Sequence, residues 1–122
     1  MRRTVLVVED DSDLRGAMLD VLESSGFDAV MAANGREALE ALHDRCEPAL
    51  ILLDLKMPVM DGFEFRRRLL DSPGLSAIPV VVVSGDSKAR NQARGLGSAP
   101  SLMKPFGVED LLRIVSKYCG NN

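Results

Sequence analysis

The sequence predicts an α/β fold in which a doubly wound, five-stranded parallel sheet is covered by helices on both faces. Five short apolar runs alternate along the chain with five amphipathic stretches. The first, third and fourth runs are apolar at consecutive rather than alternate positions, which is typical of strands that are covered on both sides. Crossover connections between such strands are right-handed. No repeat, linker or low-complexity segment interrupts the alternation.

Length and composition favour one ordinary globular domain. The chain has 122 residues and a mass of 13.2 kDa, so we expect a single domain over residues 1–122, with a core at about 4–118 and no output domain. Its apolar stretches are too short to cross a bilayer, which argues against membrane insertion. Cys46 and Cys119 lack metal-ligand spacing, and we expect two reduced thiols in a cytoplasmic protein.

The net charge of −3 hides an asymmetry between the two halves of the chain. Residues 1–61 carry six basic and thirteen acidic side chains, whereas residues 62–122 carry nine and five. No basic stripe is long enough to indicate direct nucleic acid binding. The acidic first half is compatible with a metal site or a basic partner.

The first half of the chain predicts two strands and two helices. The β-branched run Thr4–Val8 predicts the first strand. Either Asp11 or Ser12 can cap the following helix, which we expect to end at Gly26. Asp28–Ala32 predicts a second strand with a weaker signal than the first.

The second helix is expected to begin with a capping box, in which Asn34 is followed three residues later by Glu37. The remaining strands are expected at Ala49–Leu53, Ile78–Val83 and Ser101–Met103, and the remaining helices at Phe63–Leu70, Ser87–Leu96 and Val108–Val115. The consecutive residues Arg66, Arg67 and Arg68 are expected to lie on a solvated helix face.

Polar residues follow four of the five predicted strands. They are Glu9 and Asp10 after the first strand, Asp54 after the third, Ser84 after the fourth and Lys104 after the fifth. The carboxyl ends of the strands in an open parallel sheet meet at one edge, where ligands bind. Three carboxylates at this edge repel one another unless a cation such as Mg²⁺ lies among them. An aspartate beside Mg²⁺, an ammonium and a hydroxyl is suited to attack phosphorus.

Four segments together resemble the receiver domain of two-component response regulators, as in the chemotaxis response regulators. They are Val7–Asp11, Leu53–Gly62, Val83–Gly85 and Lys104–Phe106. Their order and spacing agree with that family over nearly the whole chain. The resemblance implies a flavodoxin-like (βα)5 fold with strand order 2-1-3-4-5.

The resemblance also implies a phosphorelay function. Asp54 is the expected phosphoacceptor, and Asp10 and Asp54 are the expected Mg²⁺ ligands. Glu9 completes the acidic pocket, and the backbone carbonyl of Lys56 is a further expected ligand. The implied donor is a phosphohistidine on a sensor histidine kinase or a histidine phosphotransfer protein. The domain would act on an unidentified output protein, either as a stand-alone regulator or as a receiver separated from a larger kinase or regulator.

Ser84 is the expected switch hydroxyl and Lys104 the expected catalytic lysine, with an implied cis bond to Pro105. Two features depart from the family. Ser101 stands three residues before the lysine, where receivers often carry Tyr or Phe. Glycine and proline residues near the end of the helix predicted at Ser87–Leu96 indicate that this fourth helix is short or mobile.

Two other functions remain open at the level of the sequence. A haloacid-dehalogenase-like phosphatase also uses an aspartate after an apolar strand, but it requires a second aspartate two residues later, where this chain has Lys56. A flavodoxin-like nucleotide or flavin-binding module requires a phosphate-binding loop. This chain has no glycine-rich loop of that kind, no tryptophan and one tyrosine.

Overall fold

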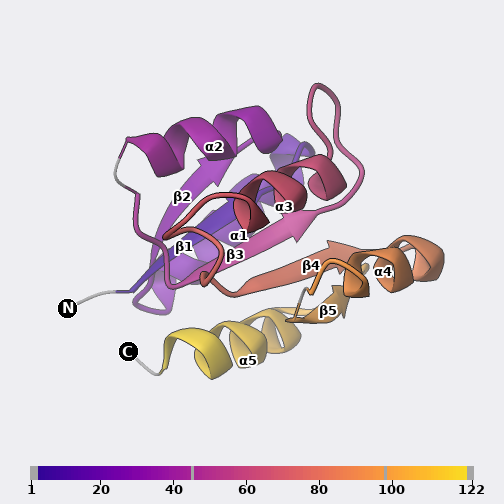
Figure 1. Ribbon diagram of the computed structural model, residues 1–122. Helices are drawn as coiled ribbons and strands as arrows, with labels where there is room; N and C mark the ends of the chain where they lie inside the picture. Colours follow the sequence, from indigo (N-terminus) through magenta and orange to yellow (C-terminus); the bar gives the residue numbers. More distant parts are fainter. Residues whose placement is uncertain (1–2, 45, 98, 121–122) are drawn as a thin grey trace.

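The structure, a computed structural model, describes residues 3–44, 46–97 and 99–120, and these form five strands alternating with five helices (Figure 1). The strands are β1 (Thr4–Val8), β2 (Asp28–Ala32), β3 (Leu50–Asp54), β4 (Val80–Ser84) and β5 (Ala99–Met103). The helices are α1 (Ser12–Ser24), α2 (Gly35–His43), α3 (Gly62–Leu70), α4 (Ser87–Arg94) and α5 (Val108–Cys119).

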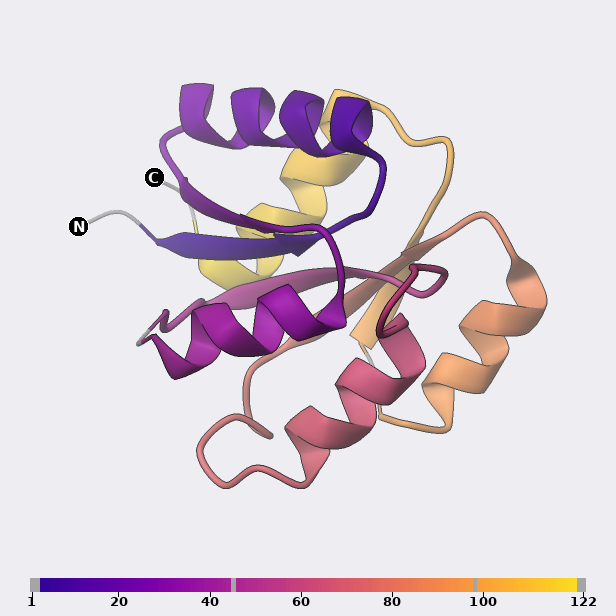
Figure 2. The same cartoon turned by 90° about the horizontal axis from the view of Figure 1, so that it is seen from above.

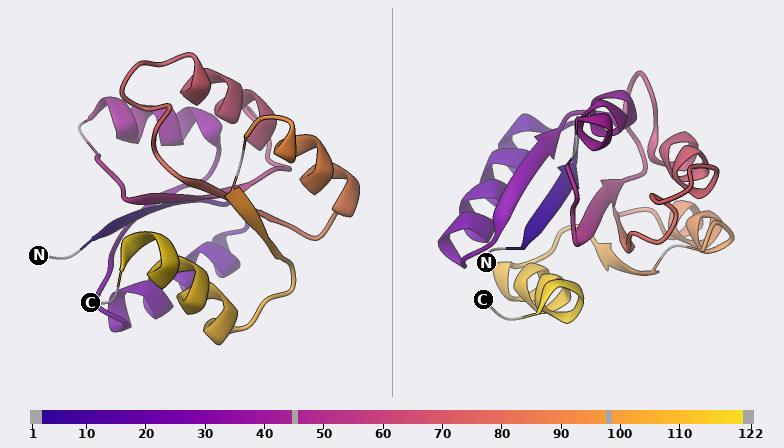
Figure 3. Two further views of the ribbon diagram at one scale, coloured as in Figure 1. Left: turned by 60° about the horizontal axis from the view of Figure 1, so that its bottom comes forward. Right: turned by 60° about the vertical axis from the view of Figure 1, so that its left-hand side comes forward.

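The five strands form one parallel sheet in the order β2-β1-β3-β4-β5. Helices α1 and α5 cover one face of the sheet, and α2, α3 and α4 cover the other (Figures 2 and 3). The predicted doubly wound architecture and strand order are therefore confirmed. None of the helices in the described ranges is long and apolar enough to cross a membrane.

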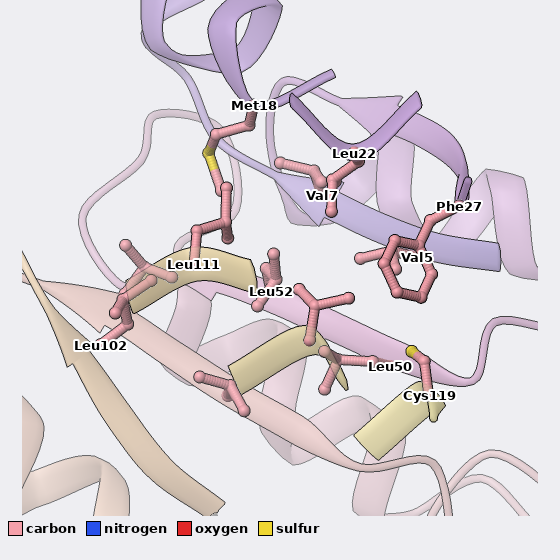
Figure 4. Close-up of a cluster of buried hydrophobic side chains, with 13 residues drawn as sticks. Val5, Val7, Met18, Leu22, Phe27, Leu50, Leu52, Leu102, Leu111 and Cys119 are labelled. Atoms are coloured by element: carbon pink, nitrogen blue, oxygen red, sulfur yellow. The ribbon is translucent and has the colours of Figure 1, made fainter. Parts of the chain in front are cut away.

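Side chains of the central strands are buried alternately on the two faces of the sheet. Val5 and Leu50 lie in the cluster under α1 and α5, together with Leu22 and the free thiol of Cys119 (Figure 4). The neighbouring Leu6 lies in the opposite cluster, under α2 and α3. This double burial explains why the strands are apolar at consecutive positions.

Polar side chains begin α1 and α2 at the predicted places. The Asp11 carboxylate, rather than Ser12, accepts hydrogen bonds from the first free N–H groups of α1. Asn34 accepts one from the N–H of Glu37 at 3.0 Å. The second hydrogen bond of the predicted capping box is made one residue earlier than expected. Glu37 Oε1 accepts it from the N–H of Ala33 at 2.9 Å, rather than from the N–H of Asn34.

The predicted boundaries of β4 and β5 shift by one or two residues. β4 begins at Val80, after Pro79, which has no N–H to donate to a strand partner, and it extends to include Ser84. β5 begins at Ala99, two residues earlier than predicted. The prediction of a short fourth helix is confirmed, since α4 has eight residues. Its mobility stays a prediction.

One of the three consecutive arginines of α3 does not lie on a solvated face. Arg67 and Arg68 are exposed, but Arg66 is only 7% exposed. The buried residues of α3 are Gly62, Phe65, Arg66 and Leu69, whose spacing places them on one face of the helix, toward the sheet. The sequence-based expectation is therefore wrong for Arg66.

Two glycines provide a test of how closely the start of α3 approaches β3. A Cβ atom on Gly62 would clash with the carbonyl oxygen of Asp54 and lie 2.8 Å from Leu55 Cα, whereas a Cβ atom on Gly16 in α1 would meet nothing within 4 Å. We expect Gly62→Ala to lower the free energy of unfolding by about 1–3 kcal/mol through overpacking. Gly16→Ala should raise it by about 0.5–1 kcal/mol. Urea denaturation measures both, and equal effects would contradict the close approach.

Candidate functional site

A pocket of about 500 Å³ lies at the carboxyl edge of the sheet. Its lining consists of Glu9, Asp10, Asp11, Asp54, Lys56, Ser84, Gly85, Asp86 and Lys104. These residues end or follow β1, β3, β4 and β5, so the parallel strands bring together every site residue that the sequence predicted. β2, the edge strand beside β1, contributes no lining residue.

Three carboxylates converge in this pocket. Glu9, Asp10 and Asp54 each offer an oxygen within 4.8 Å of the other two. Glu9 and Asp54 are buried, whereas Asp10 is exposed at the rim. The backbone N–H of Lys56 donates to Asp54 Oδ1 at 3.3 Å, which fixes the direction of that carboxylate. Clustered carboxylate oxygens with one open side are the donor set of a hard divalent cation.

Lys104 connects two of these carboxylates. Its Nζ lies 2.8 Å from Glu9 Oε1 and 3.5 Å from Asp54 Oδ2. Burial opposes the charge of Lys104, but the hydrogen bond to Glu9 and the negative charges of Asp54 and Glu9 outweigh it and raise the pKa of Lys104. The bond from Lys104 to Pro105 is cis, as the family resemblance implied.

Asp54 has a strongly perturbed acidity. Burial raises the pKa of Asp54 to about 7, with a further increase from the charge of Glu9, while the charge of Lys104 and the hydrogen bond from Lys56 act in the opposite direction. A carboxyl group with this pKa is part protonated at neutral pH. A cation bound among the carboxylates would favour the ionised, nucleophilic form.

Ser84 lies on the side of the pocket formed by β4. It is buried, and its Oγ accepts a hydrogen bond from the N–H of Asp86 at 3.1 Å. Its backbone carbonyl accepts one from the N–H of Lys104 at 3.2 Å, which joins the ends of β4 and β5. Ser101, in the place of the family's aromatic residue, lies half-buried on β5.

Sequence reasoning missed two polar contacts of the site. Lys56 Nζ pairs with Asp86 Oδ2 at 2.9 Å across the pocket rim. Arg15 of α1 donates from Nη1 to the backbone carbonyl of Glu9 at 2.8 Å, which links α1 to the loop that carries Glu9 and Asp10. The position of Asp86, just before a predicted helix, was a signal for a cap, and it does cap α4. No signal in the sequence pairs it with Lys56.

The pKa of Asp54 predicts a pH-dependent stability. Its ordinary value of 3.8 applies to the unfolded chain and about 7 to the folded one. Between these values the folded state binds more protons, so rising pH lowers the free energy of unfolding in metal-free protein. We expect Asp54→Asn to remove this loss. The variant should have a higher free energy of unfolding than wild type at about pH 8, and the difference should be smaller at about pH 5.

Urea denaturation with a chelator present measures this difference. Asp11→Asn is the matched control, because it removes an exposed charge from the same pocket and asparagine caps a helix as well as aspartate does. A stability difference between Asp54→Asn and wild type that stays constant across this pH range would contradict the raised pKa.

Comparisons with known proteins agree with this geometry. The family model of the response regulator receiver domain matches residues 5–116. Sporulation initiation phosphotransferase F of Bacillus subtilis is 29% identical over 118 residues, which cover 97% of this chain and 94% of that protein. A response regulator receiver protein from Pseudomonas putida is 34% identical, with a TM-score of 0.88 and coverage of 96% and 98%.

The receiver domain of sensor histidine kinase PA1611 from Pseudomonas aeruginosa has the same fold. Its TM-score is 0.88 at 24% identity, with coverage of 99% of this chain and 100% of that chain, and its structure is described with a magnesium ion coordinated in the active site cleft. From the family match and the shared fold, the chain belongs to the receiver domains of two-component response regulators.

Proposed function

We propose that this chain, as a single receiver domain, accepts a phosphoryl group on Asp54 from a phosphohistidine and signals by binding a partner in the cytoplasm. The observation that carries the proposal is the convergence of Glu9, Asp10 and Asp54 within 4.8 Å, with the Lys104 ammonium 3.5 Å from Asp54 Oδ2. Groups suited to act as a nucleophile, as metal ligands and as a cation for the phosphoryl oxygens therefore lie in one pocket.

The residues of the pocket fit Mg²⁺. Asp10 and Asp54, with the backbone carbonyl of Lys56, would hold the ion, and Glu9 would complete the acidic surroundings. When bound, Mg²⁺ neutralises charge on the transferring phosphoryl group. The magnesium ion described for the PA1611 receiver domain supports this assignment.

The transfer itself needs one bond formed and one bond broken. A carboxylate oxygen of Asp54 attacks the phosphorus of the donor, and the phosphorus–nitrogen bond to histidine breaks, with its electron pair returning to the imidazole nitrogen. Lys104 can leave Glu9 and pair with a phosphoryl oxygen, since its Nζ already lies next to Asp54. Ser84 Oγ can donate to another phosphoryl oxygen.

This last contact connects the chemistry to a conformational change. In the resting structure Ser84 Oγ accepts a hydrogen bond from the N–H of Asp86 at the start of α4. Rotation of the hydroxyl toward a phosphoryl group would release that N–H and favour a second arrangement of the β4–α4 junction. The output partner would recognise the second arrangement.

The phosphohistidine donor would be a sensor histidine kinase or a histidine phosphotransfer protein. Its histidine must reach Asp54, so its surface must cover the pocket rim. A second pocket of about 360 Å³ adjoins the site and is lined by Asp11, Leu14, Lys104, Pro105 and Phe106. The apolar members of this lining offer an area for such a donor to bury.

A small phosphodonor tests the proposal. Incubation with acetyl phosphate and Mg²⁺ should add the mass of one phosphoryl group, and Asp54→Asn or Asp54→Ala should abolish the addition because the nucleophilic carboxylate is gone. A chelator should slow it strongly. Intact-protein mass spectrometry measures the product.

Asp11→Asn is the control, because it changes an acid of the same pocket to which no chemistry is assigned. Normal phosphorylation of Asp54→Asn would refute the assignment of Asp54. Steady turnover of phosphate esters by the wild-type protein would support the phosphatase alternative instead.

A further inference from the structure

Arg66 of α3 is a buried cation away from the acidic pocket. Within the described ranges it is the only basic residue whose side chain is buried, and burial lowers its pKa. The two arginines that follow it, Arg67 and Arg68, are exposed on the same helix. Burying a guanidinium costs free energy unless the group is well bonded. The hydrogen bonds that Arg66 makes therefore determine whether it is stable in this position.

The guanidinium of Arg66 bonds to the turn that directly follows α4. Nε donates to the carbonyl of Leu96 at 3.1 Å, and Nη2 donates to the carbonyl of Gly97 at 3.2 Å, across thirty or thirty-one positions of sequence. These carbonyls lie just beyond the last residue of the helix, where the helix dipole favours a positive charge. Nη1 is buried and has no hydrogen-bond partner.

Helix α4 has little apolar contact with which to hold its position. Its buried residues are two alanines, Ala89 and Ala93, which pack in a small cluster with Leu55, Val82 and Phe63. By contrast, α5 buries leucine, valine and cysteine side chains in the main core. Because apolar stabilisation scales with buried area, α4 depends more than α5 on polar bonds at its ends.

The two ends of α4 bond to different parts of the molecule. Asp86, at the N-terminal end, is bonded to Lys56 and to Ser84, both of which line the acidic pocket. Arg66 holds the C-terminal end and belongs to α3, which contributes no residue to that pocket. The two ends of α4 are therefore held by separate sets of bonds, and only the N-terminal set includes residues of the acidic pocket.

We propose that Arg66 is a positioning residue that serves as the fixed pivot of α4. It holds the C-terminal end of the helix against α3 while phosphorylation releases the N-terminal end. The motion of the N-terminal end rests on the proposed function. The two hydrogen bonds from Arg66, which we call the tether, do not depend on it. Mobility of α4 is thereby confined to the β4–α4 junction and the first turns of the helix.

Hydrogen exchange in the resting protein tests the tether alone. Arg66→Met removes both bonds while keeping an unbranched side chain of similar reach, and we expect amides 92–97 to exchange at least about tenfold faster, as for the loss of one charge-assisted hydrogen bond. Arg68→Met is the matched control, since Arg68 bonds within α3 to Glu64. It should leave amides 92–97 unchanged.

Two results in the resting protein would overturn the tether. One is equal exchange of amides 92–97 in Arg66→Met and Arg68→Met. The other is faster exchange of the whole sheet in Arg66→Met, which would mean global destabilisation. If Arg66→Met does not fold, Arg66→Lys carries the test, because one ammonium can reach one carbonyl and should give an intermediate acceleration at the same amides.

A phosphoryl mimic tests the pivot. With Mg²⁺ and beryllofluoride, exchange in the wild-type protein should change at residues 84–90 and not at 92–97, whereas in the Arg66 variant the change should extend to residue 97. An equal change at both ends in the wild-type protein would overturn the pivot. Failure of the proposed function would give a different result. Asp54 would not be phosphorylated, while amides 92–97 of the resting protein would still exchange faster in Arg66→Met than in Arg68→Met.

Discussion

The Lys104 ammonium lies between two buried carboxylates, and the geometry of the acidic pocket depends on that contact. Its Nζ is 2.8 Å from Glu9 Oε1 and 3.5 Å from Asp54 Oδ2. Without a cation, two carboxylates so poorly solvated would repel each other strongly. The strand order makes the contact possible, because β1 and β3 are neighbours and the chain after β5 turns back across the end of β4. The strand order of the sheet therefore determines which charged groups meet in the pocket.

The compensation by Lys104 is incomplete, and this incompleteness suits the proposed chemistry. Three carboxylates face one ammonium. Burial raises the pKa of Asp54, and the negative charge of Glu9 adds to that increase, which Lys104 only partly offsets. A divalent cation would reverse the imbalance, and a phosphoryl group would then restore negative charge next to Lys104. The proposed reaction thus exchanges partners within an existing set of charges, which requires little reorganisation of the pocket.

The sequence was informative wherever a residue's position depends on backbone direction alone. Glu9, Asp54, Ser84 and Lys104 follow apolar runs, and parallel strands must bring such residues to one edge. Contacts between elements far apart in the chain depend instead on how each helix is rotated and how far it lies from its neighbour. The bonds from Arg66 to the end of α4 are of this kind, and three adjacent arginines look alike until the rotation of α3 is known.

The character of the contacts that hold α4 also bears on how a signal can leave the pocket. Apolar packing acts along a whole helix and resists any displacement, whereas hydrogen bonds act at points and can be exchanged one at a time. With only Ala89 and Ala93 buried, α4 is held chiefly at its ends. Displacing the N-terminal end then requires the exchange of the bonds that Asp86 makes to Ser84 and Lys56, and it leaves the core intact. In the proposed mechanism, a chain with Ser101 in place of an aromatic residue transmits the state of Asp54 through the orientation of α4, without burying a ring beside β5.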